Sequence, residues 1–252
     1  MGETQEVSMR LPSKLHPPIA FAHRGARAHA KENTSEAFDL AIRLGATGIE
    51  SDVWLTADNE LILTHDGTIG LRRRPISSMQ RADLPDSWIT LPELLLRVPD
   101  SVHLSIDVKT DDAIPELYRW LATLDPVTRA RIFLCHHDWT VLADLRARDE
   151  FVTLIDSTSM KAMSEGAERR AFQLSEAGID GVNLHNNDWT GGYATLFHRF
   201  GLLCFGWDAQ HGRIQRDLFR MGLDGIYSDH VDIMMESLAT HLGGGPANEP
   251  RI

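Results

Sequence analysis

The stretches SEAGIDGV (Ser175–Val182) and FRMGLDGI (Phe219–Ile226) are near copies of one another. In each stretch a helical pattern ends at a glycine, and a short apolar run of strand length follows. Glycine suits the end of a helix because it adopts left-handed backbone angles without a steric penalty. The repeated junction indicates that the chain is built from successive helix–strand units.

On either side of these junctions, apolar runs of strand length alternate with amphipathic helical stretches. The eight predicted barrel strands are Ile19–Ala22, Gly48–Val53, His103–Val108, Arg131–Cys135, Phe151–Ile155, Gly181–Leu184, Leu202–Gly206 and Gly225–Tyr227. A further strand, Glu60–Thr64, is predicted to pair with the second strand across the turn Thr56–Asn59. Eight such units in 252 residues favour a (β/α)8 TIM barrel. A doubly wound open sheet is the alternative, but its glycine-rich dinucleotide fingerprint is absent.

These patterns predict one domain over residues 18–240, with a short insertion after the second strand. Residues 1–17 are expected to form a loose N-terminal arm, and residues 241–252 a disordered tail. The first helix is predicted to begin with Asn33 as its cap and Glu36 at the capping-box position, and to end at Gly45.

The composition limits the partners and the compartment. With 42% hydrophobic and 24% charged residues, the chain is typical of a soluble globular protein. A formal net charge of −11 disfavours nucleic acid and stable membrane association, because their phosphates would be repelled. The apolar runs are too short to span a membrane, and the N-terminus lacks a signal-peptide pattern. Cys135 and Cys204 are predicted to be buried thiols in a reducing compartment, so we expect a cytoplasmic protein.

Ionisable side chains gather at the C-terminal ends of the first three predicted barrel strands and of the hairpin strand. They are His23, Arg24, Glu50, Asp52, His65, Asp107 and Lys109. In a (β/α)8 barrel, the active site lies at this end of the strands. Glu50 and Asp52 are spaced i, i+2 on one strand, so both carboxylates point to the same face. Asp107 and Lys109 repeat that spacing on the next barrel strand along the chain.

Three carboxylates in one mouth require a positive partner, because crowded and buried like charges are costly. An all-oxygen set without a thiolate favours one divalent cation, Mg²⁺ or Ca²⁺, over zinc. His23 and His65 are the side chains of this group that titrate near neutral pH. A metal ion that offsets charge on an anion, together with two histidines that move protons, suits the hydrolysis of a phosphodiester.

The segments HRGARAHAKENTSEAF, GIESDV, LTHD, SIDVK and FGWDAQ resemble, in order and spacing, the motifs of the glycerophosphodiester phosphodiesterase family over residues 18–232. The resemblance implies a (β/α)8 barrel that hydrolyses small glycerophosphodiesters to an alcohol and glycerol 3-phosphate. It also implies roles for eight residues. They are Glu50, Asp52 and Asp107 as ligands of the divalent cation, His23 and His65 as the acid/base pair, and Arg24, Lys109 and Trp207 as contacts of the substrate.

The sequence departs from the family pattern at several positions. Lys31 replaces a proline, Asp107 replaces a longer glutamate, and Asp208 and Gln210 replace threonine and asparagine of the late motif. The segment 67–90 is shorter than the family's usual cap subdomain and carries the basic run 72–74. These arginines are either plain solvated surface or a patch that attracts anionic substrates. The departures are expected to alter substrate preference more than chemistry.

Three alternatives share some of these features. One is a phospholipase D-like enzyme of the sphingomyelinase type, and another is a metal-dependent amidohydrolase, which usually opens with His-x-His. The third is a barrel that binds phosphodiesters without turnover. Five further residues, His136, His137, His185, Asp66 and Asp229, are expected at the rim, the histidines with an open role and the aspartates orienting loops or histidines. The sequence does not predict an oligomeric state.

Overall fold

The two similar junctions adopt the same structure in the computed structural model, which describes residues 10–243. Gly178 and Gly222 have φ angles of +70° and +88°, the left-handed values that turn the chain out of a helix. Asp224 then accepts a hydrogen bond of 2.8 Å from the backbone N–H of Cys204, at the start of the neighbouring strand. Asp180, in the other junction, likewise accepts a hydrogen bond of 2.7 Å from the backbone N–H of Leu154, which lies near the start of the strand that neighbours the one after Asp180. Each junction therefore fixes where one strand starts relative to the next.

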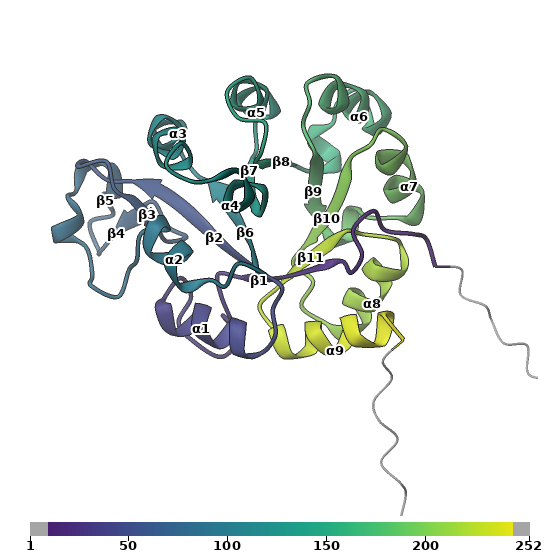
Figure 1. The fold of residues 1–252 in the computed structure, drawn as a ribbon, viewed down its shortest axis with the longest axis horizontal. Helices are drawn as coiled ribbons and strands as arrows, with labels where there is room; N and C mark the ends of the chain where they lie inside the picture. Colours follow the sequence, from purple (N-terminus) through teal and green to yellow (C-terminus); the bar gives the residue numbers. More distant parts are fainter. Residues whose placement is uncertain (1–9, 244–252) are drawn as a thin grey trace, which may run out of the picture.

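Eight parallel strands within the described residues form a closed barrel (Figure 1). They are β1 (Ile19–His23), β2 (Gly48–Leu55), β6 (His103–Val108), β7 (Ile132–His136), β8 (Thr153–Ser157), β9 (Gly181–His185), β10 (Leu203–Trp207) and β11 (Gly225–Ser228). Their order is β1-β11-β10-β9-β8-β7-β6-β2, and the pairing of β1 with β2 closes the ring. The predicted (β/α)8 TIM barrel is confirmed.

Helices surround the barrel and alternate with its strands (Figure 1). Between residues 10 and 243 they are α1 (Ser35–Arg43), α2 (Leu91–Arg97), α3 (Ile114–Leu121), α4 (Pro126–Ala130), α5 (Trp139–Arg146), α6 (Ala167–Glu176), α7 (Gly191–Arg199), α8 (Gly212–Arg220) and α9 (Val231–His241). Short 3₁₀ turns cover Ile76–Ser78, Arg81–Asp83, Asp111–Ala113, Met160–Ala162 and Asn186–Asp188.

The cap of the first helix differs from the prediction. Thr34, not Asn33, caps α1, and its hydroxyl accepts a hydrogen bond from the backbone N–H of Ala37. Asn33 instead has a left-handed φ of 55°, and its Oδ1 accepts a hydrogen bond of 2.7 Å from Ser51 Oγ on β2. The asparagine therefore joins the loop after β1 to the strand that carries two of the predicted metal ligands.

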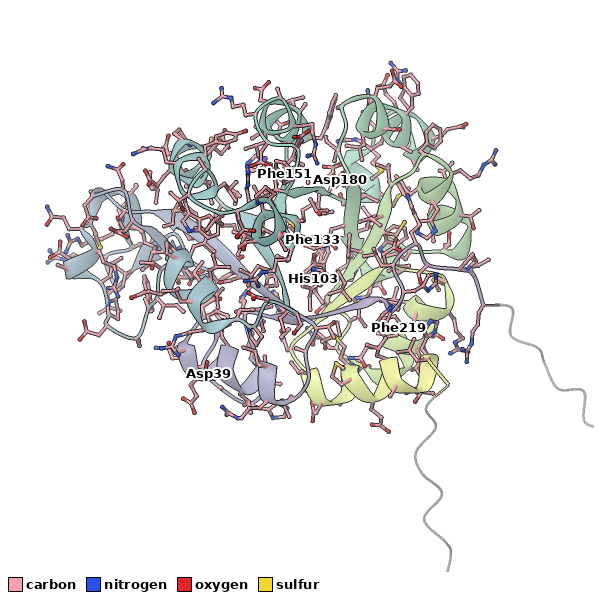
Figure 2. All side chains as sticks on the ribbon, viewed as in Figure 1. Asp39, His103, Phe133, Phe151, Asp180 and Phe219 are labelled. Carbon is pink, nitrogen blue, oxygen red and sulfur yellow. The ribbon has the colours of Figure 1, made fainter. Side chains whose placement is uncertain are left out.

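Aromatic side chains fill the interior of the barrel. Phe21 packs edge-on against Phe133 and Phe205, with ring centroids 5.5 and 6.0 Å apart, and stacks on Tyr227 at 4.7 Å. All four rings are buried. A second apolar layer lies between the strands and the helices, where Phe219 of α8 is buried (Figure 2). Because the barrel is packed below its mouth, the polar ends of the strands stand above an apolar floor.

The insertion after β2 has a small core of its own. Strand β3 (Leu61–Leu63) pairs antiparallel with β2, as the predicted hairpin requires. Beyond it, β4 (Thr68–Ile69) and β5 (Arg74–Pro75) form a second hairpin at the edge of the molecule (Figure 1). The buried residues beneath it are Ile62, Ile76, Met79 and Leu84. The insertion is therefore folded onto the outer end of β2.

The described part of the N-terminal arm is hydrogen-bonded to the barrel. The backbone N–H of Leu11 donates to the carbonyl of Arg220, and the N–H of Leu15 donates to Asp224 Oδ1. Residues 1–9 of the expected arm and residues 244–252 of the expected tail lie outside the described residues. Among residues 10–243, no helix has the length and apolar character needed to cross a membrane.

Candidate active site

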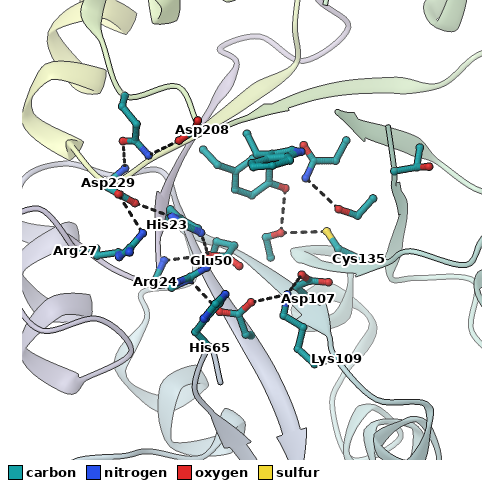
Figure 3. Close-up of a pocket in the computed structure, with 18 residues that line it drawn as sticks. His23, Arg24, Arg27, Glu50, His65, Asp107, Lys109, Cys135, Asp208 and Asp229 are labelled. Atoms are coloured by element: carbon teal, nitrogen blue, oxygen red, sulfur yellow. Dashed lines mark hydrogen bonds and ion pairs between the residues drawn. The ribbon is translucent and has the colours of Figure 1, made fainter. Parts of the chain in front are cut away.

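A cavity of about 550 Å³ opens at the C-terminal mouth of the barrel. All eight residues to which the sequence assigned a site role line this one cavity (Figure 3). They are His23, Arg24, Glu50, Asp52, His65, Asp107, Lys109 and Trp207. The structure therefore brings together side chains that are separated by up to 184 positions in the chain, from His23 to Trp207.

The turn after β1 places Arg24 against the two acidic side chains of β2. Arg24 has a left-handed φ of 54°, which is uncommon for a residue with a side chain and costs conformational energy. Its backbone N–H donates a hydrogen bond of 3.0 Å to Glu50 Oε2. Its guanidinium Nε lies 3.1 Å from Asp52 Oδ2, and its Nη1 donates to Glu32. The strained turn thus gives both carboxylates of β2 a partner from β1.

Lys109 joins the carboxylates of two neighbouring strands. Strands β2 and β6 pair in a register that sets Asp52 opposite Asp107. Lys109 Nζ lies 3.0 Å from Asp52 Oδ1 and 2.6 Å from Asp107 Oδ2. Burial alone would lower the pKa of Lys109, but the Asp107 and Asp52 carboxylates outweigh burial and raise it. The lysine is therefore held charged against the acidic side of the mouth.

The buried acids still lack positive charge. The pKa of Glu50 is raised to about 7, chiefly by burial and also by Asp52 and Asp107, against the opposing effects of His23 and Arg24. Burial lowers the pKa of His23, but the Glu50 carboxylate and the hydrogen bond to Asp229 outweigh it, so that the pKa lies above its ordinary value. His23 Nε2 lies 3.9 Å from Glu50 Oε2. A proton or another cation is therefore strongly favoured at this point.

Each of the two mouth histidines has a carboxylate neighbour. His23 Nδ1 lies 2.6 Å from Asp229 Oδ1, which leaves Nε2 facing the cavity. Asp229 also accepts from Arg27, a cavity residue that the sequence did not single out. His65 Nδ1 lies 3.0 Å from Asp66 Oδ1, and the His65 side chain is 43% exposed. His23 is thus held firmly, whereas His65 stands at the open edge of the mouth.

The donor set of the mouth fits a hard divalent cation. Glu50, Asp52 and Asp107 offer carboxylate oxygens, the ligands that Mg²⁺ and Ca²⁺ prefer. Asp52 Oδ2 is buried without a hydrogen-bond partner in the described chain, since its ion pair with Arg24 is poorly aligned for one. Within residues 10–243, however, these oxygens do not all lie within 4.8 Å of one another. Lys109, which pairs with Asp52 and Asp107, would have to share these oxygens with an ion.

The opposite side of the cavity is polar but mostly uncharged, and the sequence did not single it out. Ser157, Thr158 and Asn183 line it from β8, the loop after β8, and β9. Asn183 is only 7% exposed; its Nδ2 donates weakly to Ser157 Oγ at 3.5 Å, and its Oδ1 is buried without a partner among the described residues. Period-two alternation from the interior residue Ile155 could have found Ser157, had the predicted strand not ended at Ile155.

Trp207 and the rim histidines complete the mouth. Trp207 lines the cavity with 42% of its surface exposed, and the His185 ring meets it edge-on at 4.6 Å. His136 is buried, where its Nδ1 accepts from the N–H of Asp138 and its Nε2 lies 3.1 Å from an Asp111 oxygen. The cavity lining does not include His136, His137 or His185. In the described structure these three histidines therefore support the rim rather than face the cavity.

The fold and the site together define the class of the protein: a (β/α)8-barrel hydrolase of phosphoric diesters. Residues 23–233 match the model of the "Glycerophosphoryl diester phosphodiesterase family", and the chain belongs to that family.

Relatives and solved structures agree with this assignment. The YhdW protein of Bacillus subtilis is 23% identical over 234 residues, which are 86% of this chain and 96% of YhdW. The structure of a glycerophosphodiester phosphodiesterase from Thermotoga maritima has a TM-score of 0.74 at 21% identity and covers 86% of this chain and 97% of its own. A phosphodiesterase of Oleispira antarctica, solved with the product sn-glycerol-3-phosphate, has a TM-score of 0.74 at 17% identity and covers 88% of this chain and 96% of its own.

Proposed function

We propose that the protein hydrolyses small glycerophosphodiesters to an alcohol and glycerol 3-phosphate, by acid/base catalysis with two histidines and one divalent cation. The observation that carries the proposal is that one cavity is lined by both histidines, the three predicted metal ligands, and the cationic side chains of Arg24 and Lys109. The product bound in the Oleispira antarctica phosphodiesterase supports glycerol 3-phosphate as the shared product.

Glu50, Asp52 and Asp107 would hold the cation, Mg²⁺ or Ca²⁺. Such an ion supplies Lewis-acid polarisation of the phosphoryl oxygens. The raised pKa of Glu50 supports this role, because it means that the ionised carboxylate is poorly compensated in its buried position. A bound cation would supply the missing positive charge. Asp107 has a shorter side chain than the glutamate of the family pattern, and its Oδ2 is paired with Lys109, so Lys109 would have to share that oxygen with the ion.

His23 and His65 divide the proton transfers. One takes the proton of the attacking oxygen, and the other gives a proton to the oxygen of the departing alcohol, which would otherwise leave as a poor alkoxide. Asp229 fixes the His23 ring through Nδ1, so that Nε2 is the atom that exchanges the proton. The open position of His65 allows its ring to reach a substrate that enters from solvent.

Arg24 and Lys109 would bind the phosphate. Both side chains are paired with Asp52, so their positive charges are already held next to the position proposed for the phosphoryl group. Trp207 and the uncharged side of the cavity would then receive the alcohol portion, because they lie on the β8–β10 side of the mouth, across from the acids.

The test is a panel of glycerophosphodiesters with neutral, cationic and anionic alcohols, assayed with Mg²⁺, with Ca²⁺ and with excess chelator. We expect glycerol 3-phosphate as the common product, loss of activity in chelator and recovery with either ion. Full activity in chelator, by a protein found free of metal, would contradict the metal assignment. Turnover of phospholipid vesicles alone would favour the phospholipase D-like alternative, and binding without turnover would favour a non-catalytic barrel.

We also propose the cytoplasm as the compartment. Both cysteines are free and buried, Cys135 in the lining of the cavity and Cys204 within β10. Free thiols suit a reducing environment. Fractionation of cells that express the untagged chain would test this location, and recovery in the membrane or culture medium would contradict it.

A further inference from the structure

Three side chains that can bind a metal ion meet on the rim of the mouth, outside the cavity lining. They are His29 in the loop after β1, His230 after β11, and Asp232 in the first turn of α9. Ligand atoms of the three all lie within 4.8 Å of one another. We propose that His29, His230 and Asp232 form a second metal site, which binds a first-row transition dication such as Zn²⁺.

The ligand types decide the kind of ion. Two imidazoles and one carboxylate are a set that zinc and its neighbours accept, whereas Mg²⁺ and Ca²⁺ prefer oxygen alone. With bonds of about 2.0–2.1 Å, two ligands of one tetrahedral ion lie roughly 3.3 Å apart. His29 Nε2 and Asp232 Oδ1 are hydrogen-bonded at 3.2 Å, and a zinc ion would replace the proton between them. This pair therefore already has the spacing of two ligands on one zinc ion.

The third ligand has room to join them. The rings of His29 and His230 are nearly perpendicular, at 87°, with centroids 6.3 Å apart, so neither ring covers the face of the other. Within residues 10–243 the His230 ring makes no hydrogen bond, although its backbone N–H is anchored on Ser228 Oγ. A nitrogen of the His230 ring is thus available to turn toward the other two. Water or a further small ligand would complete four-fold coordination.

The backbone around the three ligands is cross-linked. The N–H of Ala28 donates to the carbonyl of Asp229, which joins the loop that carries His29 to the loop that carries His230. The N–H of His29 donates to the carbonyl of Ala26 within its own loop. Binding of an ion therefore needs side-chain rotation rather than rearrangement of the loops, which keeps the entropic cost low.

A second group of similar composition shows what a structural cluster looks like. His198, Cys204 and Asp224 also lie within metal-binding distance of one another. Both carboxylate oxygens of Asp224 are already used there, by backbone N–H groups of the N-terminal arm and of Cys204 and by His198. That cluster secures the arm and the start of β10. Within residues 10–243, the side chains of the rim group make one hydrogen bond, between His29 and Asp232, so the group has no comparable structural role.

The rim site is adjacent to the proposed catalytic machinery. Asp229, whose carboxylate holds His23, directly precedes His230. The carbonyl of the same Asp229 is the one that accepts from Ala28. An ion on the rim would therefore stiffen the backbone that positions Asp229.

The experiment is calorimetric titration of the full chain with ZnCl₂ in phosphate-free buffer. Millimolar Mg²⁺ is present to occupy the proposed oxygen site. We expect one Zn²⁺ per chain with micromolar affinity. His29→Ala and His230→Ala should each weaken it by about 10–100-fold, at least the loss seen when even an indirect metal partner is removed. Asp232→Asn, which keeps the shape but not the charge, should also weaken it. His137→Ala is the matched control, because His137 is an exposed rim histidine outside the cluster. This variant should bind zinc like the parent protein.

The visible spectrum of the Co²⁺-loaded protein gives an independent measurement. Bands typical of histidine-bound cobalt are expected in the parent and in the His137→Ala variant, and their loss is expected in His29→Ala. Circular dichroism would show that each variant is folded, as the exposed position of His29 predicts. Absence of zinc binding at millimolar metal would overturn the proposal. Equal binding by His29→Ala and the parent, or binding that is lost only in Glu50→Gln, would overturn it as well.

Discussion

The two sides of the barrel mouth are built differently. On the side of β1, β2 and β6, the ionisable groups that face the cavity are held in ion pairs, as Lys109 is by Asp52 and Asp107, although Asp52 Oδ2 makes no aligned hydrogen bond within the described chain. On the side of β8 and β9, Asn183 leaves a buried oxygen unpartnered within the described chain. Groups that are positioned before the substrate arrives are suited to chemistry. Groups that wait for a partner are suited to choosing the substrate, because a buried polar atom penalises any ligand that leaves it unpaired.

The largest expected effect on activity comes from removing either catalytic histidine of the charged side of the mouth. His23→Ala and His65→Ala should each lower kcat by about 10²–10⁴-fold, the range for a positioned acid or base, with a smaller change in KM. Steady-state kinetics on a glycerophosphodiester would measure this. The variants should unfold at the temperature of the parent protein, since both residues lie at the mouth rather than in the aromatic core. Parental turnover by both variants would contradict their assignment as acid and base.

A smaller effect on activity is expected from weakening the interaction between Asp229 and His23 on the same side of the mouth. Asp229→Asn removes one of the influences that raise the pKa of His23, so this pKa should fall. The protonated fraction of His23 at neutral pH falls with it, and the limb of the kcat–pH profile that reports His23 should move to lower pH. Asp66→Asn is the matched control, because Asp66 is largely exposed and contacts His65 instead. A profile that moves equally in both variants, or in neither, would contradict a specific coupling of Asp229 to His23.

The structure also shows which features a single sequence could reveal. The i, i+2 spacing of Glu50 and Asp52 predicted a shared face because strand geometry is local and has a period of two. The existence and order of the barrel strands followed from length and hydrophobicity, but some of their ends did not, since β8 runs over Thr153–Ser157 rather than the predicted Phe151–Ile155. The cap of α1 did not, because Asn33 is diverted by Ser51, a residue 18 positions away that only the closed barrel brings within 2.7 Å.

The charge pattern inside the site was also beyond local inference. The sequence placed Lys109 near a phosphate, but nothing in the spacing of Asp107 and Lys109 indicates that the ammonium also contacts Asp52 on the neighbouring strand. That contact depends on the register of β2 and β6. Asn183 was missed because an asparagine in a strand has no charge to draw attention to it. Whether its side-chain oxygen has a hydrogen-bond partner depends on the tertiary structure, which the sequence alone does not reveal.

The uncharged side should give a weaker response that appears in binding. Asn183→Ala should raise KM by about 2- to 10-fold with little change in kcat, since one neutral hydrogen bond contributes about 0.5–1.5 kcal/mol. The increase should depend on the alcohol and be largest for substrates whose hydroxyl groups can donate to Asn183 Oδ1. Asn187→Ala is the matched control, because Asn187 is an exposed asparagine outside the cavity lining. A loss in kcat as large as that of His23→Ala would place Asn183 in the chemistry and erase the distinction between the two sides.

The smallest effect is expected from the basic run that lies beyond both sides. Arg72, Arg73 and Arg74 are exposed at the hairpin of β4 and β5, beside the fully exposed Leu71, and none of them lines the cavity (Figure 1). Because none of the three lines the cavity, we expect most of their effect on a phosphate bound there to be screened at physiological ionic strength, where the Debye length is about 8 Å. Replacing all three arginines by glutamine should therefore leave kcat unchanged and raise KM for anionic diesters by less than about 2-fold at that ionic strength, with a larger rise at low salt. KM values for one neutral and one anionic diester, each at two salt concentrations, would measure the effect. A strong, salt-independent rise in KM for the anionic diester alone would mean that the arginines of the hairpin contact the substrate directly, and would make the hairpin a third part of the binding site.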